Sequence, residues 1–255
     1  MQKLDLNIKT YKVYYINLDK SIQRRNFMET QFKKLNIPIT RMPAVYGKKL
    51  SETFLKKAKS QHKILTHYPY LNDGEIGLTK TYFDLWRIIA DQEEDFAVIL
   101  EDDALLTQDF FNDLQELLQT ITENDFLDIS GQKGFYRIDS NKLTTKFLVP
   151  SLRTTGQIIG KKASKKLSKN LTTFYSPIDV LKQDVFKHQT PVLTTNKSYV
   201  SSNHKNIGGT TIQLNKMPQF KKIIREVIRP FWQLITLLTY KPYRIIKNYS
   251  FYQSN

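Results

Sequence analysis

A run of five apolar residues at positions 96–100 (FAVIL) leads directly into three acids, Glu101, Asp102 and Asp103. A short continuous apolar run is typical of a strand buried in the centre of a sheet. A second run, rich in β-branched and aromatic residues, occupies positions 12–18 (KVYYINL), contains Asn17 near its end and is followed by Asp19. We therefore expect polar side chains at the carboxyl ends of two core strands.

Stretches with helical spacing alternate with short strand-like runs along the chain. Helices are predicted up to residue 35 and over 51–60, 75–94, 110–122, 161–169 and 177–187. Strands are predicted at 12–18, 37–45, 96–100, 126–129, 156–160 and 191–200, and residues 135–150 fit either an irregular segment or a hairpin. This alternation predicts an α/β domain with a mostly parallel sheet, in which ligands bind beyond the carboxyl ends of the strands.

Charge is distributed unevenly over the 255 residues, which carry 39 Lys and Arg against 24 Asp and Glu, a formal net charge of +15. Residues 216–255 contain eight of these basic residues and one acid, so this segment alone contributes +7. Apolar residues lie among its basic ones, and Pro230 and Pro242 divide it into short predicted helices. We therefore expect a domain at 1–215 and, at 216–255, a basic amphipathic helical tail that binds an anionic lipid surface. The alternative is a tail that packs on the domain's own surface.

The composition excludes several classes of site. The chain has no Cys, which excludes a disulfide framework, a Cys-ligated zinc site, an iron–sulfur cluster and a cysteine nucleophile. Its four His, at 62, 67, 188 and 204, show none of the usual metal-binding spacings. The first residues contain no apolar stretch with a cleavage site, and no apolar run is long enough to cross a bilayer. We expect a cytoplasmic chain.

Three adjacent carboxylates repel one another, and a cation relieves that repulsion. Hard divalent ions such as Mn²⁺ and Mg²⁺ prefer oxygen ligands and often share them with substrate phosphates. In an extended backbone Glu101 and Asp103 project to the same side, so both can face one ligand. The acids therefore predict a metal site. The alternative is a solvated strand end, at which the acids cap the next helix.

An ordered set of short motifs resembles glycosyltransferase family 25, which comprises bacterial lipopolysaccharide and lipooligosaccharide glycosyltransferases related to collagen galactosyltransferases. The motifs cover roughly residues 12–203 and are modest singly but specific in their order. They are YINLD at 15–19 with Arg24 and Arg25, PAVYG at 43–47, GEIG at 74–77 through LW at 85–86, ILEDD at 99–103, Thr155 and Gly156 with Ala163 and Leu167, and PID at 177–179.

The resemblance implies a GT-A-type fold, a Rossmann-like nucleotide-binding domain that needs Mn²⁺ or Mg²⁺. It also implies an inverting transfer of a hexose, often galactose, from a UDP-sugar to a saccharide acceptor of lipooligosaccharide or lipopolysaccharide. The partners would be a UDP-sugar, a lipid-linked oligosaccharide and the anionic cytoplasmic face of the inner membrane, on which the protein would be peripheral.

Roles for single residues follow from the matched motifs. Asp103, with Glu101 or Asp102, would hold the metal. Asp179 would be the general base that takes the acceptor's proton, with Asp128 at the end of another strand as its competitor. The alternative role for Asp179 is to bind the acceptor. The residues expected to bind the nucleotide-sugar are Asn17, Asp19, Arg24, Arg25, Glu75, Glu101, Asp102, Thr155 and Gly156.

The chain departs from the family pattern at three places. Thr81 and Tyr82 stand where the family usually has Ser and His, and Tyr46 stands where it often has Asp. Thr195 and Asn196, before Ser201 and Ser202, replace a Gln-containing block. These departures bear on the donor sugar and the acceptor and leave the acidic motif intact.

Two other functions remain compatible with some of these features. The basic composition suggests a nucleic-acid-binding protein, although the acidic triplet would repel phosphate and no nucleic-acid-binding motif is present. The carboxylates could also serve a metal-dependent phosphatase or nuclease, which would usually need a fuller set of ligands for two metals. We expect a glycosyltransferase that binds no nucleic acid.

Overall fold

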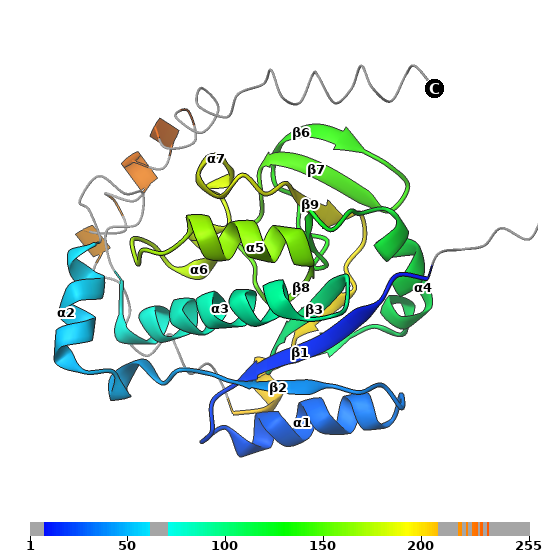
Figure 1. The fold of residues 1–255 in the computed structure, drawn as a ribbon, viewed down its shortest axis with the longest axis horizontal. Helices are drawn as coiled ribbons and strands as arrows, with labels where there is room; N and C mark the ends of the chain where they lie inside the picture. The colour runs from blue at the N-terminus through cyan, green and yellow to red at the C-terminus, as the bar shows by residue number, and fades with distance from the viewer. Residues whose placement is uncertain are drawn as a thin grey trace, which may run out of the picture.

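The computed structural model describes residues 8–61 and 71–208 and a few positions between 219 and 234. In this part of the chain an eight-stranded sheet has the order β2-β1-β3-β8-β5-β9-β7-β6, and β10 and β4 form a separate two-stranded sheet (Figure 1). The strands are β1 (Tyr11–Asn17), β2 (Thr40–Pro43), β3 (Phe96–Glu101), β4 (Ala104–Leu106), β5 (Phe126–Asp128), β6 (Phe135–Ser140), β7 (Thr144–Val149), β8 (Gly156–Gly160), β9 (Val192–Thr195) and β10 (Val200–Ser202). The helices are α1 (Ile22–Lys33), α2 (Glu52–Ser60), α3 (Asp73–Asp91), α4 (Gln108–Gln119), α5 (Lys161–Asn170), α6 (Ile178–Leu181) and α7 (Val185–His188), with 3₁₀ turns η1 (Gly47–Lys49) and η2 (His204–Asn206).

Most strands of the large sheet share one direction. Strands β1, β2 and β3 are parallel, as are β5 and β9, whereas β8 and β7 run against the other six. The expected α/β class with a mostly parallel sheet is therefore confirmed. Because β8 is reversed, its first residue, Gly156, pairs with Leu100 near the end of β3. The segment before β8 thus reaches the edge at which β1, β3 and β5 end.

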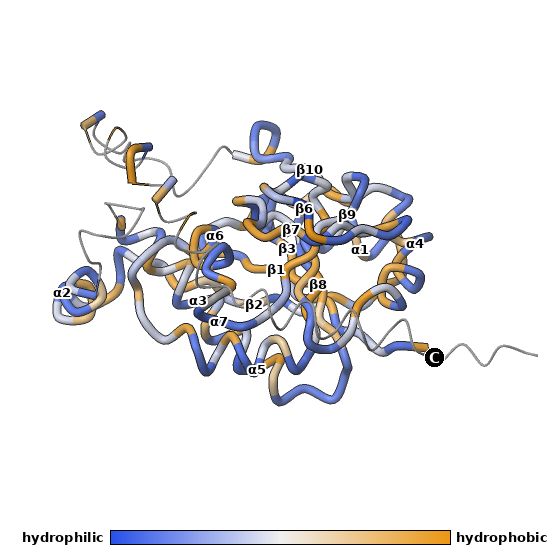
Figure 2. The backbone as a smooth tube through the Cα atoms, turned by 90° about the horizontal axis from the view of Figure 1, so that it is seen from above, coloured by the Kyte–Doolittle hydropathy of each residue, from blue (hydrophilic) through white to orange (hydrophobic). Residues whose placement is uncertain are grey.

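Side chains of the central strands alternate between two cores, as the period of two in a strand requires. On one face Tyr15 and Val98 pack with buried residues of α1 and α4, and on the other Tyr14 and Ile99 pack with α3 and α5. Figure 2 shows the hydrophobic strands β1, β3 and β8 in the middle of the molecule. This double burial explains why the sequence of β3 is continuously apolar.

The acids do not cap a helix. Glu101 is the last residue of β3, and Asp102 and Asp103 form a turn that leads into β4. The next helix, α4, begins only at Gln108, so the alternative of acids capping the next helix is wrong. The turn forms because β4 pairs antiparallel with β10, which places Ser202 opposite Ala104.

Two predicted elements are each divided in the structure. The strand predicted at 191–200 is wrong as a single strand, because β9 belongs to the large sheet and β10 pairs with β4. The helix predicted at 177–187 is two short helices, α6 and α7, separated at Lys182, Gln183 and Asp184, whose side chains are buried. Residues 135–150 form the hairpin of β6 and β7.

The tail at 216–255 lies almost wholly outside the described residues. The helices predicted for it therefore stay a prediction. At the described positions Phe220, Ile223, Val227, Phe231 and Leu234 are 50–66% exposed. Among the described residues no helix is long and apolar enough to cross a membrane.

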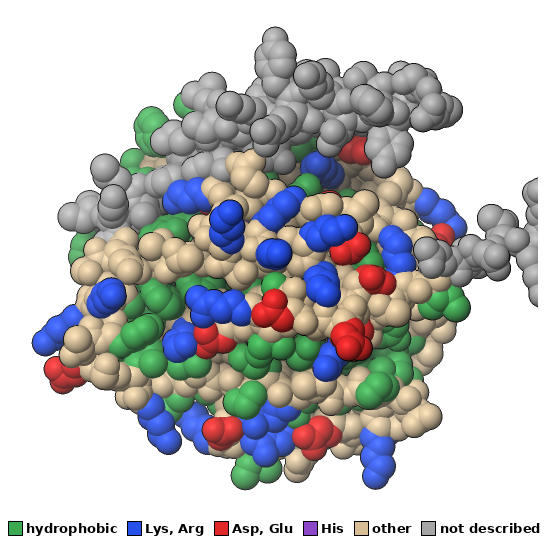
Figure 3. Space-filling model, viewed as in Figure 1, with side chains coloured by type: hydrophobic (Ala, Val, Ile, Leu, Met, Phe, Trp, Pro, Cys, Tyr) green, Lys and Arg blue, Asp and Glu red, His purple; other side chains and the backbone are tan. Residues whose placement is uncertain are grey.

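The surface of the α/β domain is shown from one side in Figure 3. This face carries Lys and Arg side chains with Asp and Glu among them, which is typical of a solvated surface.

Candidate active site

A cavity of about 500 Å³ opens at the edge where β1 and β3 end. Its volume lies within the range of small-molecule and cofactor sites. Seven segments of the chain contribute to it. It is lined by Ile16, Leu18, Arg24, Ala44, Val45, Tyr46, Gly47, Gly74, Glu75, Leu78, Glu101, Asp102, Asp103, Thr154, Pro177, Ile178, Asp179, Ser202 and His204.

Asp102 is held by two donors from the first βα unit. Its Oδ1 accepts a hydrogen bond from Nη1 of Arg24 on α1, and its Oδ2 accepts one from Nδ2 of Asn17, 2.8 Å away at the end of β1. Burial raises the pKa of Asp102, although Arg24 and Asn17 oppose that rise. Both carboxylate oxygens are thus engaged by the protein, which fixes the acidic turn against β1 and α1.

Asp103 has one oxygen bound and one without a protein partner. The hydroxyl of Ser202 donates to its Oδ2 at 2.7 Å, and Nδ1 of His204 lies 2.8 Å from the same hydroxyl. Because a serine hydroxyl carries one hydrogen, Nδ1–H of His204 donates to it when Ser202 donates to Asp103. The other oxygen, Oδ1, is buried and accepts no hydrogen bond from the described residues. A buried acceptor of this kind requires an explanation, and a bound ligand supplies one.

Glu101 has a perturbed acidity. The hydroxyl of Thr154 donates to its Oε1 at 2.6 Å. Burial raises the pKa of Glu101 to about 7, and the neighbouring charges of Asp103 and Asp102 also raise it, whereas the Thr154 hydroxyl opposes the rise. A carboxyl group that changes charge near neutral pH is typical of a functional site.

Asp179 contributes a fourth carboxylate to the same cavity from the first turn of α6. Its Oδ1 accepts a hydrogen bond from the backbone N–H of Val180 at 2.9 Å. Burial raises the pKa of Asp179, and the nearby charge of Lys182 opposes that rise. Asp179 is therefore a carboxylate in the cavity lining whose burial raises its pKa.

Glu75 both starts a helix and faces the cavity. Its Oε2 accepts from the backbone N–H of Asn72 at 2.8 Å, and Oδ1 of Asn72 accepts from the backbone N–H of Glu75 at 2.9 Å. This reciprocal capping box begins α3 at Asp73, two residues before the start predicted from the sequence. Its presence in the cavity lining agrees with the role suggested by the motif.

Two of the three departures from the family pattern, at Tyr46 and Tyr82, lie at and beneath the cavity. Tyr46 lines it, and Nζ of Lys20 lies 4.0 Å from the centre of the Tyr46 ring. Tyr82 is fully buried, and its hydroxyl donates to the carbonyl of Thr154 at 3.3 Å. Both therefore bear on the shape of the site.

Several predicted site residues do not line the cavity. Asp19 is exposed and pairs with Arg41 at 2.5 Å, and Arg25 donates to the backbone carbonyl of Asp19. Asn17 acts through Asp102. Asp128 is fully buried. The backbone carbonyl of Thr155 accepts a hydrogen bond from the backbone N–H of Glu101 at 3.0 Å. Gly156 pairs within the sheet.

Sequence reasoning missed Thr154, Ser202 and His204. Thr154 stands one residue before the predicted Thr155 and Gly156, so the motif was close by. Ser202 lies in the block that departs from the family pattern, and His204 was one isolated histidine without metal-binding spacing. Only the pairing of β10 with β4 brings Ser202 and His204 to Asp103.

The donor set fits a divalent cation that shares its ligands with a substrate. Within residues 8–61 and 71–208 no three His, Cys, Asp or Glu side chains form a group that could hold a metal ion by themselves. However, none of these described residues donates a hydrogen bond to the buried Oδ1 of Asp103, and Glu101 lines the same cavity. One or two carboxylates completed by substrate phosphate oxygens are a usual Mg²⁺ arrangement.

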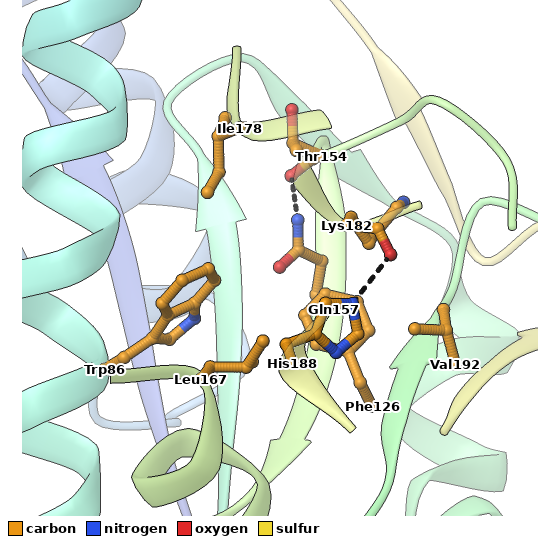
Figure 4. Close-up of a pocket in the computed structure, with 9 residues that line it drawn as sticks. All are labelled: Trp86, Phe126, Thr154, Gln157, Leu167, Ile178, Lys182, His188 and Val192. Carbon is orange, nitrogen blue, oxygen red and sulfur yellow. Dashed lines mark hydrogen bonds between the residues drawn. The ribbon is translucent and has the colours of Figure 1, made fainter. Parts of the chain in front are cut away.

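A second cavity, of about 10 Å³, lies in the interior between α3 and β8. Nε1 of Trp86 and Oε1 of Gln157 are buried and find no hydrogen-bond partner within the described ranges, and Figure 4 shows both directed into this space. Its volume suits one water molecule. It is therefore too small to be a substrate site.

Comparison with known proteins agrees with the motifs. The model of glycosyltransferase family 25 (LPS biosynthesis protein) matches residues 10–182. A glycosyltransferase 25 family member of Aedes aegypti is 32% identical over 97 residues, 36% of this chain and 16% of that protein. Procollagen galactosyltransferase 1-B of Xenopus laevis is 30% identical over 116 residues, 43% of this chain and 19% of that protein. The chain thus spans less than a fifth of these relatives.

The fold also aligns with a solved structure, that of a glycosyltransferase involved in the glycosylation of the major capsid of PBCV-1. The alignment covers 86% of this chain and 98% of that protein's chain. Its TM-score is 0.41 and its sequence identity 8%. The GT-A-type, Rossmann-like domain that the motifs implied is confirmed by the family match together with the α/β sheet. Because the family model covers well over half of its residues, the chain belongs to glycosyltransferase family 25.

Proposed function

We propose that the protein is an inverting, metal-dependent glycosyltransferase that moves a hexose from a UDP-sugar to a saccharide acceptor of lipooligosaccharide or lipopolysaccharide. The observation that carries this proposal is Oδ1 of Asp103, which is buried in a cavity of about 500 Å³ and has no hydrogen-bond partner in the described part of the chain. Family membership supports a transferase, and the relatives named as procollagen galactosyltransferases favour galactose as the sugar.

Asp103 and Glu101 are the residues that would hold Mn²⁺ or Mg²⁺. Such an ion, when bound, neutralises charge on the leaving diphosphate. Arg24 lines the cavity but is paired with Asp102, so we assign it to the support of the acidic turn. Arg25, which donates to Asp19 outside the cavity lining, has no assigned role in binding.

Asp179 is the group we assign as general base. In an inverting transfer the acceptor hydroxyl oxygen bonds to the anomeric carbon while the bond from that carbon to the UDP oxygen breaks. The hydroxyl proton passes to the Asp179 carboxylate, and UDP departs with the bonding electron pair. Its competitor Asp128 accepts hydrogen bonds from Ser130, Ser151 and Lys182 and lies outside the cavity lining, so it is a poor candidate.

The tail would bring this site to its acceptor. We propose that residues 216–255 bind the anionic cytoplasmic face of the inner membrane, where the protein would be peripheral. The exposed apolar side chains at Phe220, Ile223, Val227, Phe231 and Leu234 support this, as does the net charge of the segment. Apolar and basic residues together are what an interfacial helix requires.

Asp103→Asn tests the proposed site, because it keeps the size of the side chain and removes its charge. We expect UDP with Mn²⁺ to raise the thermal midpoint of the wild type but not of the variant, since a ligand stabilises the state that binds it. Transfer from the preferred UDP-sugar should fall about 100-fold or more, equivalent to about 2.7 kcal/mol of transition-state stabilisation.

The matched control is Asp109→Asn, which changes an exposed acid paired with Lys197 and should keep near-normal transfer. Retention of more than half of the activity by Asp103→Asn would refute the assignment. Release of free phosphate from nucleotides without an acceptor would instead favour a phosphatase.

A further inference from the structure

Asp128 is an ionised carboxylate buried outside the cavity. It ends β5 and is fully buried, yet three donors reach it: the backbone N–H of Ser130 at 2.8 Å, the hydroxyl of Ser151 at 2.5 Å and Nζ of Lys182 at 2.9 Å. Burial by itself would raise the pKa of Asp128, but Lys182 and the two serines hold that pKa below its usual value.

Lys182 connects this carboxylate to the segment that precedes β8. It follows α6 directly, and its Nζ also donates to the backbone carbonyl of Arg153. The next residue, Gln183, donates from Nε2 to the carbonyl of Pro150 at 2.6 Å. These two contacts tie Pro150 and Arg153 directly to the residues that follow α6, and Ser151 is joined to Lys182 through Asp128.

The two segments joined by these contacts each adjoin a carboxylate that lines the cavity. Thr154, next to Arg153, donates to Glu101, and its carbonyl accepts from Nε2 of Gln157 at 3.3 Å (Figure 4). Asp179 lies three residues before Lys182 in the same helical turn. One buried ammonium group therefore sets the positions of two cavity walls relative to each other.

We propose that Asp128 and Lys182 are positioning residues that hold the Thr154–Glu101 contact and Asp179 in the arrangement that transfer requires. Neither residue lines the cavity, so neither would touch the donor. Stability alone does not account for the pair, because apolar residues of similar volume often replace a buried ion pair without loss of stability. The expected effect on catalysis rests on the proposed function. The expected effect on the positions of Thr154 and Asp179 does not.

The test is the double variant Asp128→Asn with Lys182→Met, which removes both charges together. Lys182→Met alone would leave a buried unpaired charge and could fail to fold. In the double variant the tie to Arg153 is lost without a net buried charge. We expect kcat to fall at least tenfold while the KM for the UDP-sugar changes less than threefold, and amide exchange to quicken at 151–155 and 178–183.

Leu117→Ala is the control for general loss of stability, because Leu117 is fully buried on α4 in the core on the other face of the sheet. At a temperature where it is folded, its kcat should stay within twofold of the wild type and exchange at 151–155 should be unchanged. A double variant with wild-type kcat would overturn the proposal. If the wild type transfers no sugar, the proposed function fails, and unchanged exchange in the double variant would then overturn the positioning role separately.

Discussion

At the scale of single residues, the three adjacent acids differ in what their oxygens contact. Asp102 is bound by Arg24 and Asn17, and Glu101 accepts from Thr154. Asp103 keeps one buried oxygen that has no hydrogen-bond partner among the described residues. The difference arises because successive side chains leave the turn in different directions. Of the three acids, Asp103 and Glu101 are therefore the better suited to bind a ligand, whereas Asp102 lines the cavity with both oxygens already bound by the protein.

Arg24→Ala should destabilise the fold strongly, because it leaves Asp102 buried with its charged partner removed. Loss of one partner of a buried pair costs about 3–5 kcal/mol. Urea unfolding measures this change. The adjacent Arg25→Ala is the control, since Arg25 makes a 4.0 Å ion pair with the exposed Asp19 and a hydrogen bond to its backbone carbonyl. Its loss should cost less than about 1 kcal/mol. Equal losses in the two variants would contradict the assignment.

At the scale of elements, α3 places the loop after β2 at the cavity. Gly77 lies so close to this loop that a Cβ there would be 2.4 Å from the carbonyl oxygen of Val45. The hydroxyl of Thr81, one turn later, accepts from the N–H of Val45 at 2.9 Å. Val45, Gly47 and Glu75 all line the cavity, so the contact between loop and helix shapes one of its walls.

Gly77→Ala tests this contact against helix propensity. In an isolated helix the change would be favourable by about 1 kcal/mol. Here we expect a loss of about 1–3 kcal/mol, because the added methyl must displace backbone. Urea unfolding gives the sign, and Arg87→Ala on the exposed part of the same helix should change stability by less than about 0.5 kcal/mol. A more stable Gly77→Ala would show that the loop moves freely.

At the scale of the whole molecule, charge separates the chain into a moderately basic body and a strongly basic tail. Each basic residue near an anionic surface contributes about 1 kcal/mol at most, and salt weakens the attraction. Apolar residues in the tail would add a contribution that salt does not remove.

Removal of residues 216–255 should abolish binding to vesicles that contain anionic lipid, whereas the full chain should bind them less tightly as salt rises. Vesicle co-sedimentation measures both effects. A variant with Lys161→Gln and Lys165→Gln on α5 keeps the tail and should bind almost normally. Undiminished binding without the tail would refute the proposed anchor.

Local patterns along the chain were sufficient for the α/β class, for most of the strands and helices and for the acidic motif. They succeed because burial on both faces requires a continuous apolar strand, and packing on one face requires helical spacing. The family resemblance pointed to Glu101, Asp103, Glu75 and Asp179, all of which line the cavity.

Tertiary structure alone decided which polar groups complete the site. The reversed direction of β8 brings Thr154 to Glu101, and the pairing of β10 with β4 brings Ser202 and His204 to Asp103. The tertiary structure also buries Asp128 in an ion pair with Lys182, outside the cavity lining. These contacts join residues about 50 to 100 positions apart. Spacing along a chain carries no information about such contacts, because they depend on how separate strands are ordered in space.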